Sequence, residues 1–333
     1  MMDCIGIDVS KQTLVVFDGT QEGRFPNLPG LELFRTWLKE RFPQGTASPV
    51  LIFEPTGPYS HELVLLCARE RIRAHILNPK RSHHFRAALG RRSKNDPVDA
   101  RTLYAYHVLL PETEFAIPAP NPQAETLRHH LNAYQLVQNS RIRFANHLEA
   151  ARQEGNAPQL LLEELTAEVQ HQQQREEMLL RTTIDWVEQQ PELGTAFHRL
   201  QTIPGIGPIT TLCLLLLELT YPGANRQELT ALVGLDPRER QSGTCLHLPR
   251  HISKNGQALV RRLLYLAALS AARNQPHFLS PFYRQLVARG KHKKQALIAV
   301  ARKLLLVAHA VYCSEEPFRA AGVREGVQEV IAA

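Results

Sequence analysis

Four acidic side chains in the first hundred residues are the groups in this sequence best placed to do chemistry. They are Asp8, Glu54, Asp96 and Asp99. Carboxylates gathered without basic partners raise one another's pKa, so such a cluster is typical of a site that holds a hard cation such as Mg²⁺. Two such ions roughly 4 Å apart can bind the attacking and the leaving oxygen of a phosphoryl transfer. The four acids therefore predict a magnesium site, with all four as ligands.

Two of these acids each end an apolar run of four residues. Asp8 follows the run Cys4–Ile7, and Glu54 follows the run Val50–Phe53. Runs of this kind are typical of buried strands, and the strands of an α/β layer carry the residues at their carboxyl ends to one edge of the sheet. Taken singly, an acid at a strand end is also a common turn or capping residue.

The other two acids are predicted to lie on one helix. Asn95 is a suitable N-cap residue, and Pro97 is tolerated in the first helical turn. Residues three apart on a helix are neighbours, so Asp96 and Asp99 would share a face.

The composition describes an ordinary globular protein with a basic surface. The chain has 333 residues, 44% of them hydrophobic and 21% charged, and its net charge of +7 favours a polyanionic partner. Its five cysteines are scattered without CxxC spacing, which argues against a zinc site and for free thiols in a reducing cytoplasm. No basic and then apolar leader opens the sequence, and the longest apolar run, Ile209–Leu219, is too short to span a membrane.

Residues 1–116 alternate strand-like runs with helical patterns, which predicts a mixed α/β layer. The expected strands cover residues 5–9, 14–17, 50–53 and 74–77, and the expected helices cover residues 31–38 and 61–71.

Residues 117–192 begin with a proline-rich linker and continue as two helical stripes. Apolar residues recur at spacings of three and four in 127–148 and again in 162–186, which predicts an antiparallel helical hairpin or coiled coil. The second stripe is polar at Gln172 and Glu176. Such a stripe usually serves packing, so we interpret it as a structural or dimerising arm.

Residues 193–318 are predicted to be mainly helical, with a tail at 319–333. The segment Ile203–Pro208 resembles the turn of a helix-hairpin-helix, in which Gly205 and Gly207 would let backbone N–H groups approach a phosphate. A simple tight turn is the alternative.

Basic residues near the acids and at loop–helix junctions are candidates for nucleic-acid binding through phosphate contacts. Charge runs are also common on solvated surfaces. The candidates are Arg91, Arg92, Lys94, Arg238, Arg240, Lys254, Arg261 and Arg262.

Five motifs together resemble the insertion-sequence-110 (IS110) family of DEDD transposases, in the family's order and over nearly the whole chain. They lie at residues 5–11, 54–59, 94–101, 203–207 and 234–243. The resemblance implies a RuvC-like domain of RNase H fold at 1–116, a coiled-coil arm at 117–192 and a helical transposase domain at 193–318. By position, Asp8, Glu54, Asp96 and Asp99 match the family's metal-binding acids.

The same resemblance implies a function. Ser242 matches the family's nucleophilic serine, which forms a covalent phosphoserine with DNA. The implied partners are the DNA of the element ends and of the target, together with a structured guide RNA encoded by the element. Homodimers would assemble into tetramers, with the acids and the serine supplied by different subunits, in a prokaryotic cytoplasm and close to the nucleoid. The segment 243–250 holds less glycine and serine than the family pattern has there, so the geometry of this loop stays open.

Three other functions are compatible with part of this sequence. A RuvC-type metal-dependent nuclease would need the acids but no serine. A sugar-kinase or actin-like ATPase is suggested by residues 5–10, but the second glycine-rich phosphate loop is missing. An architectural nucleic-acid-binding protein would account for the charge and the helices but not for the acids.

Overall fold

The computed structural model describes residues 3–43, 49–89, 96–109, 120–238, 241–242, 246–247, 251–273 and 277–319. For residues 96–98, 241–242 and 246–247 it describes the backbone alone. The chain divides into two compact units at Pro120. The predicted tail at 319–333 lies, from residue 320 on, outside the described residues.

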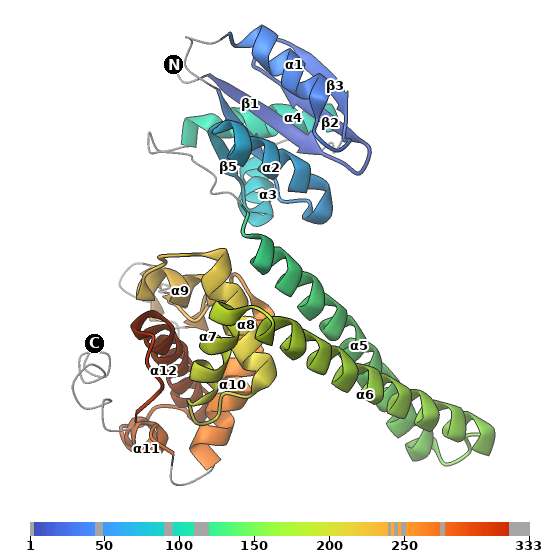
Figure 1. Ribbon diagram of the computed structural model, residues 1–333, viewed down its shortest axis with the longest axis vertical. Coiled ribbons are helices and arrows are strands. Elements are labelled where there is room, and N and C mark those ends of the chain that lie inside the picture. The colour runs from blue at the N-terminus through green and yellow to red at the C-terminus, as the bar shows by residue number, and fades with distance from the viewer. Residues whose placement is uncertain are drawn as a thin grey trace. The chain divides into compact units, whose positions relative to one another are not determined.

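The first unit contains a five-stranded sheet in the order β3-β2-β1-β4-β5 (Figure 1). β1 lies antiparallel to β2, with Ile7 opposite Val16, and parallel to β4, with Ile7 opposite Phe53. The sheet therefore has an antiparallel half and a parallel half that meet at β1. The strands are β1 (Cys4–Val9), β2 (Thr13–Phe17), β3 (Glu22–Pro26), β4 (Val50–Phe53) and β5 (Ala74–Ile76).

Helices cover both faces of this sheet. On one face α1 (Glu32–Arg41) and α2 (His61–Glu70) pack Phe34 and Leu63 against Ile5 and Ile7. On the other face α4 packs Leu103 against Cys4 and Ile52. α4 (Asp96–Ala105) follows α3 (Pro79–Ala88), and the 3-10 helices η1 (Gly57–Ser60) and η2 (Tyr106–Leu109) complete the unit.

The predicted mixed α/β layer is confirmed, as are the four expected strands. The sequence pattern does not predict β3 or α3. β3 is an edge strand with the sequence Glu-Gly-Arg-Phe-Pro, in which Phe25 alone contributes a large apolar side chain, against Phe34 and Trp37. α3 is rich in basic residues and histidine, and Ser82 is its one buried residue, so its sequence has no apolar stripe to reveal it.

The second unit is mostly helical, as predicted. Four strands of two residues each were not expected: β6 (Pro237–Arg238) pairs with β9 (His251–Ile252), and β7 (Gln241–Ser242) pairs with β8 (Leu246–His247). The helices are α5 (Pro122–Glu154), α6 (Gln159–Glu188), α7 (Pro191–Gln201), α8 (Pro208–Thr220), α9 (Arg226–Val233), α10 (Ala258–Arg273), α11 (Ser280–Ala288) and α12 (Lys293–Ser314).

The first two of these helices, α5 and α6, form a long antiparallel pair that reaches away from the other helices of the unit (Figure 1). Local signals fix the ends of α5. The Asn121 side chain accepts hydrogen bonds from the backbone N–H groups of Gln123 and Ala124, at 2.9 and 3.3 Å, and Gly155 ends the helix at a φ of 73°. We call this pair the arm.

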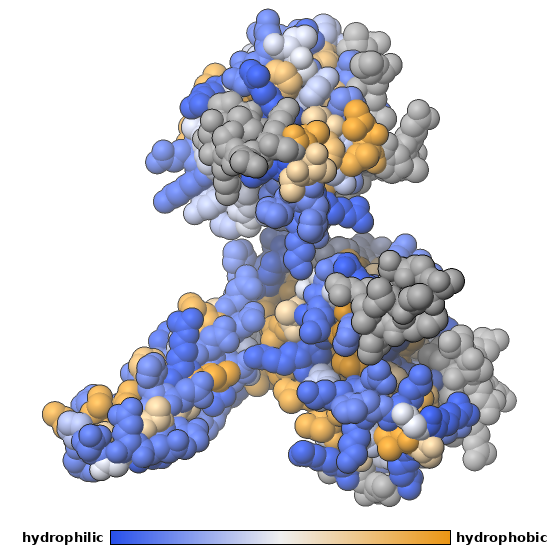
Figure 2. All heavy atoms as spheres, turned by 180° about the vertical axis from the view of Figure 1, so that it is seen from behind, coloured by the Kyte–Doolittle hydropathy of each residue, from blue (hydrophilic) through white to orange (hydrophobic). Residues whose placement is uncertain are grey.

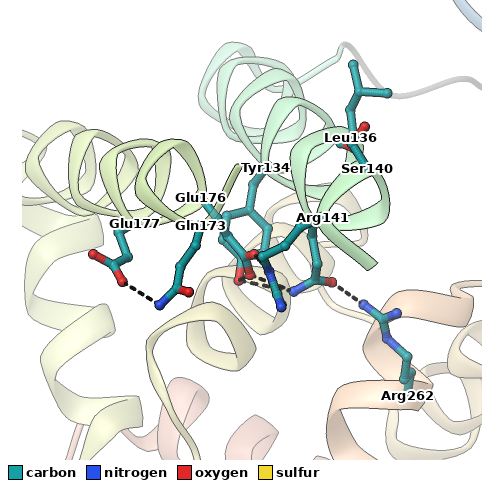
Figure 3. Close-up of polar contacts among 9 residues, drawn as sticks. Tyr134, Leu136, Ser140, Arg141, Gln173, Glu176, Glu177 and Arg262 are labelled. Atoms are coloured by element: carbon teal, nitrogen blue, oxygen red, sulfur yellow. Dashed lines mark hydrogen bonds and ion pairs between the residues drawn. The ribbon is translucent and has the colours of Figure 1, made fainter. Parts of the chain in front are cut away.

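Glu176, one of the two polar positions in the second stripe, is the centre of a hydrogen-bond network in the arm (Figure 3). The Glu176 carboxylate accepts hydrogen bonds from the Tyr134 hydroxyl at 2.8 Å, from Gln138 Nε2 at 3.0 Å and from Arg141 Nε at 2.6 Å. Burial alone would raise the pKa of Glu176, but these hydrogen bonds outweigh burial and lower it. Arg262 of α10 donates to Gln138 Oε1, so the network also joins the arm to the helical body.

The two ends of the arm differ in polarity. At the base, Leu127, Leu131 and Val187 belong to the core of the helical unit. Near the α5–α6 turn, Leu160 is 69% exposed and Leu161 is 46% exposed. Figure 2 shows apolar patches at this far end, on an otherwise hydrophilic arm.

Among the described helices, α12 alone is long and apolar enough to cross a membrane. Val300, Leu304 and Leu305 are fully buried in the core of the unit, among residues of α8 and α10. We interpret α12 as the central core helix.

Candidate catalytic site

Asp8 and Glu54 lie at the same edge of the sheet. Asp8 is the penultimate residue of β1, and Glu54 directly follows β4. β1 and β4 are parallel, and Ile7 is opposite Phe53, so Asp8 and Glu54 are the next pair in the register. Both residues are half-buried.

The alternation of side chains directs both acids toward the face that α4 covers. Cys4 and Ile52 pack on that face, whereas Ile5, Ile7 and Phe53 pack on the other. Side chains two residues apart on a strand share a face, so Asp8 lies on the α4 side, and we expect the same of Glu54 one residue beyond its strand.

α4 rests directly on β1 at Gly6. A Cβ atom added to Gly6 would lie 2.1 Å from the carbonyl oxygen of Ala100 and 2.3 Å from the backbone nitrogen of Tyr104. Asp99 is the residue before Ala100 and is 8% exposed. The close approach at Gly6 therefore brings the helix segment that carries Asp99 onto the strand that carries Asp8.

Two arginines fix the surroundings of α4. Arg86 of α3 places Nη2 at 2.8 Å from Asp99 Oδ1. Arg101 of α4 donates from Nε to Glu22 of β3 at 2.7 Å, and its guanidinium lies over the Phe17 ring, 5.1 Å from the centroid. The helix is thus tied at one point to α3 and at another to the edge of the sheet.

The donor set suits a hard cation, because it consists of carboxylate oxygens. Asp8, Glu54 and Asp99 share one side of the sheet edge. Among the side chains that the structure describes, no three metal-binding groups are close enough together to hold one ion. The Asp96 side chain lies outside the described residues, although its backbone begins α4 as predicted.

The segment that contains Ser242 leaves the helical unit from a short paired stem. Arg238 of β6 is opposite His251 of β9, so the two ends of the segment 239–250 lie side by side. Ser253 reinforces the stem, because its backbone N–H donates to the Asp236 carbonyl at 2.9 Å and its hydroxyl donates to the Asp236 carboxylate. Within the segment, the Ser242 backbone pairs with Leu246 in β7 and β8, and its side chain is outside the described residues.

Two glycines lock the base of this stem against the end of α9. Gly234 has a φ of 73°, and an added Cβ would lie 2.0 Å from the carbonyl oxygen of Asn255. Gly256 has a φ of 81°, and an added Cβ would lie 1.9 Å from the carbonyl oxygen of Leu232. Neither approach leaves room for a side chain, so we call this contact the glycine interlock.

The candidate nucleic-acid residues fall into three groups. Arg91, Arg92, Lys94 and Arg240 lie outside the described residues. Arg261 donates from Nη1 to the Val233 carbonyl at 2.8 Å, and Arg262 bonds to Gln138, so both guanidinium groups contact the protein itself. Arg238 and Lys254 are exposed.

The turn between α7 and α8 has the geometry of a tight helical hairpin. Gly205 adopts a φ of 84°, and the Pro204 carbonyl lies 3.0 Å from His277 Nε2. Gly207 precedes α8, whose N-terminus receives no side-chain cap. An added Cβ at Gly207 would meet nothing within 4 Å, so this end of the turn is open.

Sequence reasoning missed the contributions of Gly6 and Arg86. A glycine inside an apolar strand is a recognisable signal of close backbone approach, so the role of Gly6 was open to prediction. No feature of the sequence connects Arg86 with Asp99, because α3, the helix that carries Arg86, has no apolar stripe that would predict it.

Two family models match the chain, one in each unit. A model for DEDD transposases of the IS110 type, described as "Transposase", matches residues 5–154. The model described as "Transposase IS116/IS110/IS902 family" matches residues 197–283. The first match contains all four candidate acids, and the second contains Ser242.

Several known proteins are similar to this chain. The "Pilin gene-inverting protein" of Moraxella lacunata is 28% identical over 331 residues, covering 94% of this chain and 97% of that protein. Its namesake from Moraxella bovis is 28% identical over 330 residues with the same coverage. The "Insertion element IS110 uncharacterized 43.6 kDa protein" of Streptomyces coelicolor is 31% identical over 116 residues, 34% of this chain and 27% of that protein. With both family models matched and with relatives along nearly its full length, the chain belongs to the IS110 family of transposases.

Proposed function

We propose that this transposase cuts and rejoins DNA through a covalent bond to Ser242. In the proposed step the Ser242 hydroxyl oxygen attacks a backbone phosphorus, a phosphoserine ester forms, and the bond from phosphorus to the leaving sugar oxygen breaks. The serine proton is lost and the leaving oxygen gains one. A hydroxyl of the exchanged strand then attacks the phosphoserine and releases Ser242.

The observation that carries the acidic half of the proposal is the shared side of Asp8, Glu54 and Asp99. The parallel register, the alternation of side chains and the contact at Gly6 direct all three toward one end of β1. With Asp96 as fourth ligand, they would hold Mg²⁺ on a RuvC-like sheet, for which the mixed strand order is suitable. Bound Mg²⁺ would supply charge neutralisation at the phosphate and activation of the attacking oxygen.

We also propose a role for Arg86, which contacts Asp99. Its guanidinium, 2.8 Å from Asp99 Oδ1, offsets part of the negative charge that the acids bring together. We propose that Arg86 holds Asp99 in position beside the other acids.

Two observations support the proposed role of Ser242: the match to the transposase family and the exposed basic residues at the stem of its segment. Arg238 and Lys254 are exposed on either side of the segment that carries Ser242, where their charges would attract a DNA backbone. We propose the open end of the turn at Gly205 and Gly207 as a further backbone contact, and Arg91, Arg92, Lys94 and Arg240 as phosphate contacts.

Assembly and guidance are also proposed. Leu160 and Leu161 leave apolar surface at the far end of the arm, which a second copy of the chain would cover in a homodimer that forms tetramers. An element-encoded RNA would select the DNA partners, in keeping with the basic net charge of +7. We expect the protein to act in the cytoplasm of a prokaryote.

A second candidate function is inversion of a DNA segment, which the names of the two Moraxella relatives suggest. Inversion and transposition use the same cutting and joining chemistry and differ in how the two DNA sites are arranged. A plasmid carrying both arrangements of the element ends separates the two outcomes by the size of the products.

The test of the mechanism is a Ser242→Ala variant, compared with a Ser140→Ala variant in the arm. Wild type and Ser140→Ala should form a protein–DNA adduct that survives denaturant, because the adduct is a covalent ester. Ser242→Ala should form no adduct and exchange no strands, yet bind DNA normally. An adduct in Ser242→Ala, or free cleaved ends without any adduct in wild type, would favour hydrolysis by the acidic site.

A further inference from the structure

A pocket in the helical unit opens beside the stem of the Ser242 segment. Its volume is about 680 Å³, which lies within the range of sites for small organic groups. Pro237 and His251 line the pocket, one on each strand of the stem from which the segment 239–250 departs.

The wall of this pocket is apolar and contains one aromatic ring. Ile252, Leu286 and Ile298 line it, together with the half-buried ring of Tyr265 on α10. A flat apolar group that enters would lie against this ring, and stacking on an aromatic side chain is how proteins hold unpaired nucleobases without reading their sequence. Gln295 adds an amide that can pair with the edge of a base.

The rim is basic. Lys254, Lys291 and Lys294 line the pocket, all three are exposed, and none of the described lining residues is acidic. Lys254 has a φ of 54° and donates its backbone N–H to the Gly234 carbonyl at 3.2 Å, so the glycine interlock fixes its position. An apolar pocket with exposed lysines in its lining is complementary to a nucleotide, which has a flat aromatic base that stacks through its faces and an anionic phosphate.

The start of α12 adds further positive charge beside this pocket. Lys293 and Lys294 occupy its first turn, which contains no acidic residue. Cations at the positive end of a helix dipole are unfavourable, and a bound anion reverses that effect. The His292 side chain caps this helix end by accepting a hydrogen bond from the Lys294 backbone N–H at 3.3 Å. A phosphate beside Lys291 and Lys294 would add the negative charge that the first turn lacks.

The pocket lies close to the proposed nucleophile. Ser242 is five positions after Pro237, a lining residue of the pocket, so their Cα atoms are at most about 18 Å apart. A nucleotide in the pocket would therefore lie within a few nucleotides of a phosphate bonded to Ser242.

We propose that this pocket takes one unstacked nucleotide of the DNA strand that is cut, with its base against Tyr265 and its phosphate at Lys291 and Lys294. The inference rests on the proposed recombinase function. It assigns to the pocket the task of holding the strand in place next to the break.

The experiment measures binding without chemistry. The full-length chain is mixed in EDTA with a single-stranded DNA oligonucleotide that carries 5-iodouracil, irradiated, and digested for mass spectrometry. The expected crosslink is on Tyr265. Tyr265→Ala should weaken binding roughly tenfold, the range of one lost base stack, while Tyr265→Phe should bind as wild type does.

Lys293 offers a matched control for the phosphate contact. Lys293→Ala and Lys294→Ala remove the same charge from the same helical turn, but only Lys294 lines the pocket. Lys294→Ala should weaken binding several-fold more than Lys293→Ala. Equal losses, a crosslink outside the pocket, or no binding of the oligonucleotide would overturn the proposal.

Two further measurements separate the proposal from its alternatives. An RNA oligonucleotide of the same sequence should compete no better than DNA; stronger competition would assign the pocket to RNA and refute a DNA occupant. Because no bond is made or broken in EDTA, the crosslink is independent of the adduct assay with Ser242→Ala. A missing adduct with an intact Tyr265 crosslink would reject the phosphoserine mechanism alone.

Discussion

The close contact between Gly6 and α4 predicts that the Gly6→Ala variant loses both stability and activity. The added Cβ would meet the Ala100 carbonyl oxygen at 2.1 Å, whereas ordinary contact begins near 3.4 Å, so the helix must retreat by about 1.3 Å. Both obstructing atoms belong to the backbone, and no change of side-chain rotamer relieves them. Because Asp99 adjoins Ala100, the same retreat separates it from Asp8.

Two effects follow from this displacement. Overpacking of a core usually costs 1–3 kcal/mol, and a backbone obstruction belongs at the upper end, about 3 kcal/mol of unfolding free energy. A misplacement of about 1 Å at a reacting centre costs on the order of 100-fold in rate. Gly6→Ala should therefore lower the melting temperature of the first unit by roughly 10–20 °C and reduce strand exchange at least about 100-fold.

Calorimetry and a strand-exchange assay below the lowered melting temperature measure these effects. Gly194→Ala is the control, because Gly194 lies in helix α7 and an added Cβ would lie 3.3 Å from the nearest atom. That variant should stay within about 1 kcal/mol of wild type. Wild-type stability and activity in Gly6→Ala would show that α4 does not rest on β1 at this position.

Three other predictions follow from the described contacts. Glu176→Ala should lower the free energy of unfolding by about 3 kcal/mol in denaturant titrations, because the buried Tyr134 hydroxyl and the half-buried Arg141 guanidinium lose their acceptor. Substitution of its exposed neighbour, Glu177→Ala, should change that free energy by under about 0.5 kcal/mol. Replacing Leu160 and Leu161 together by serine should reduce the mass found by light scattering to that of a smaller assembly; an unchanged mass would exclude the far end of the arm as an interface. Burial would raise the pKa of Asp18, but hydrogen bonds from Gln21, Thr20 and Arg41 lower it to about 2. The free energy of unfolding of wild type should therefore fall by about 1 kcal/mol relative to that of Asp18→Asn as the pH falls from 4 to 2. Parallel profiles of this free energy against pH in the two proteins would refute this.

The sequence predicts the sheet of the first unit because its central strands are buried on both faces. Cys4–Ile7 and Val50–Phe53 have no polar side chain until the acid that ends each run, and burial on both faces requires that pattern. β3 and α3 carry no such signal, since one lies at the edge and the other presents a basic surface. As a result the sequence locates Asp99 on a helix but does not reveal its partner Arg86.

The polar positions of the arm show a different limit. Gln172 and Glu176 are visible in the sequence as interruptions of an apolar stripe, and interruptions alone do not reveal what fills them. Three partners of Glu176 lie in α5, 35 to 42 residues away along the chain, and their hydroxyl, amide and guanidinium groups satisfy the carboxylate. Only the register of the two helices brings these groups together, and that register is a property of the folded pair.

The paired ends of the segment 239–250 make it a separable module. Because Arg238 and His251 are neighbours in the stem, the 12 residues between them enter and leave the helical unit at one place. The glycine interlock lies outside this insert, and the cost of closing a loop rises only slowly with its length. A change in the length of this segment would therefore leave the glycine interlock and the helices that it joins in place.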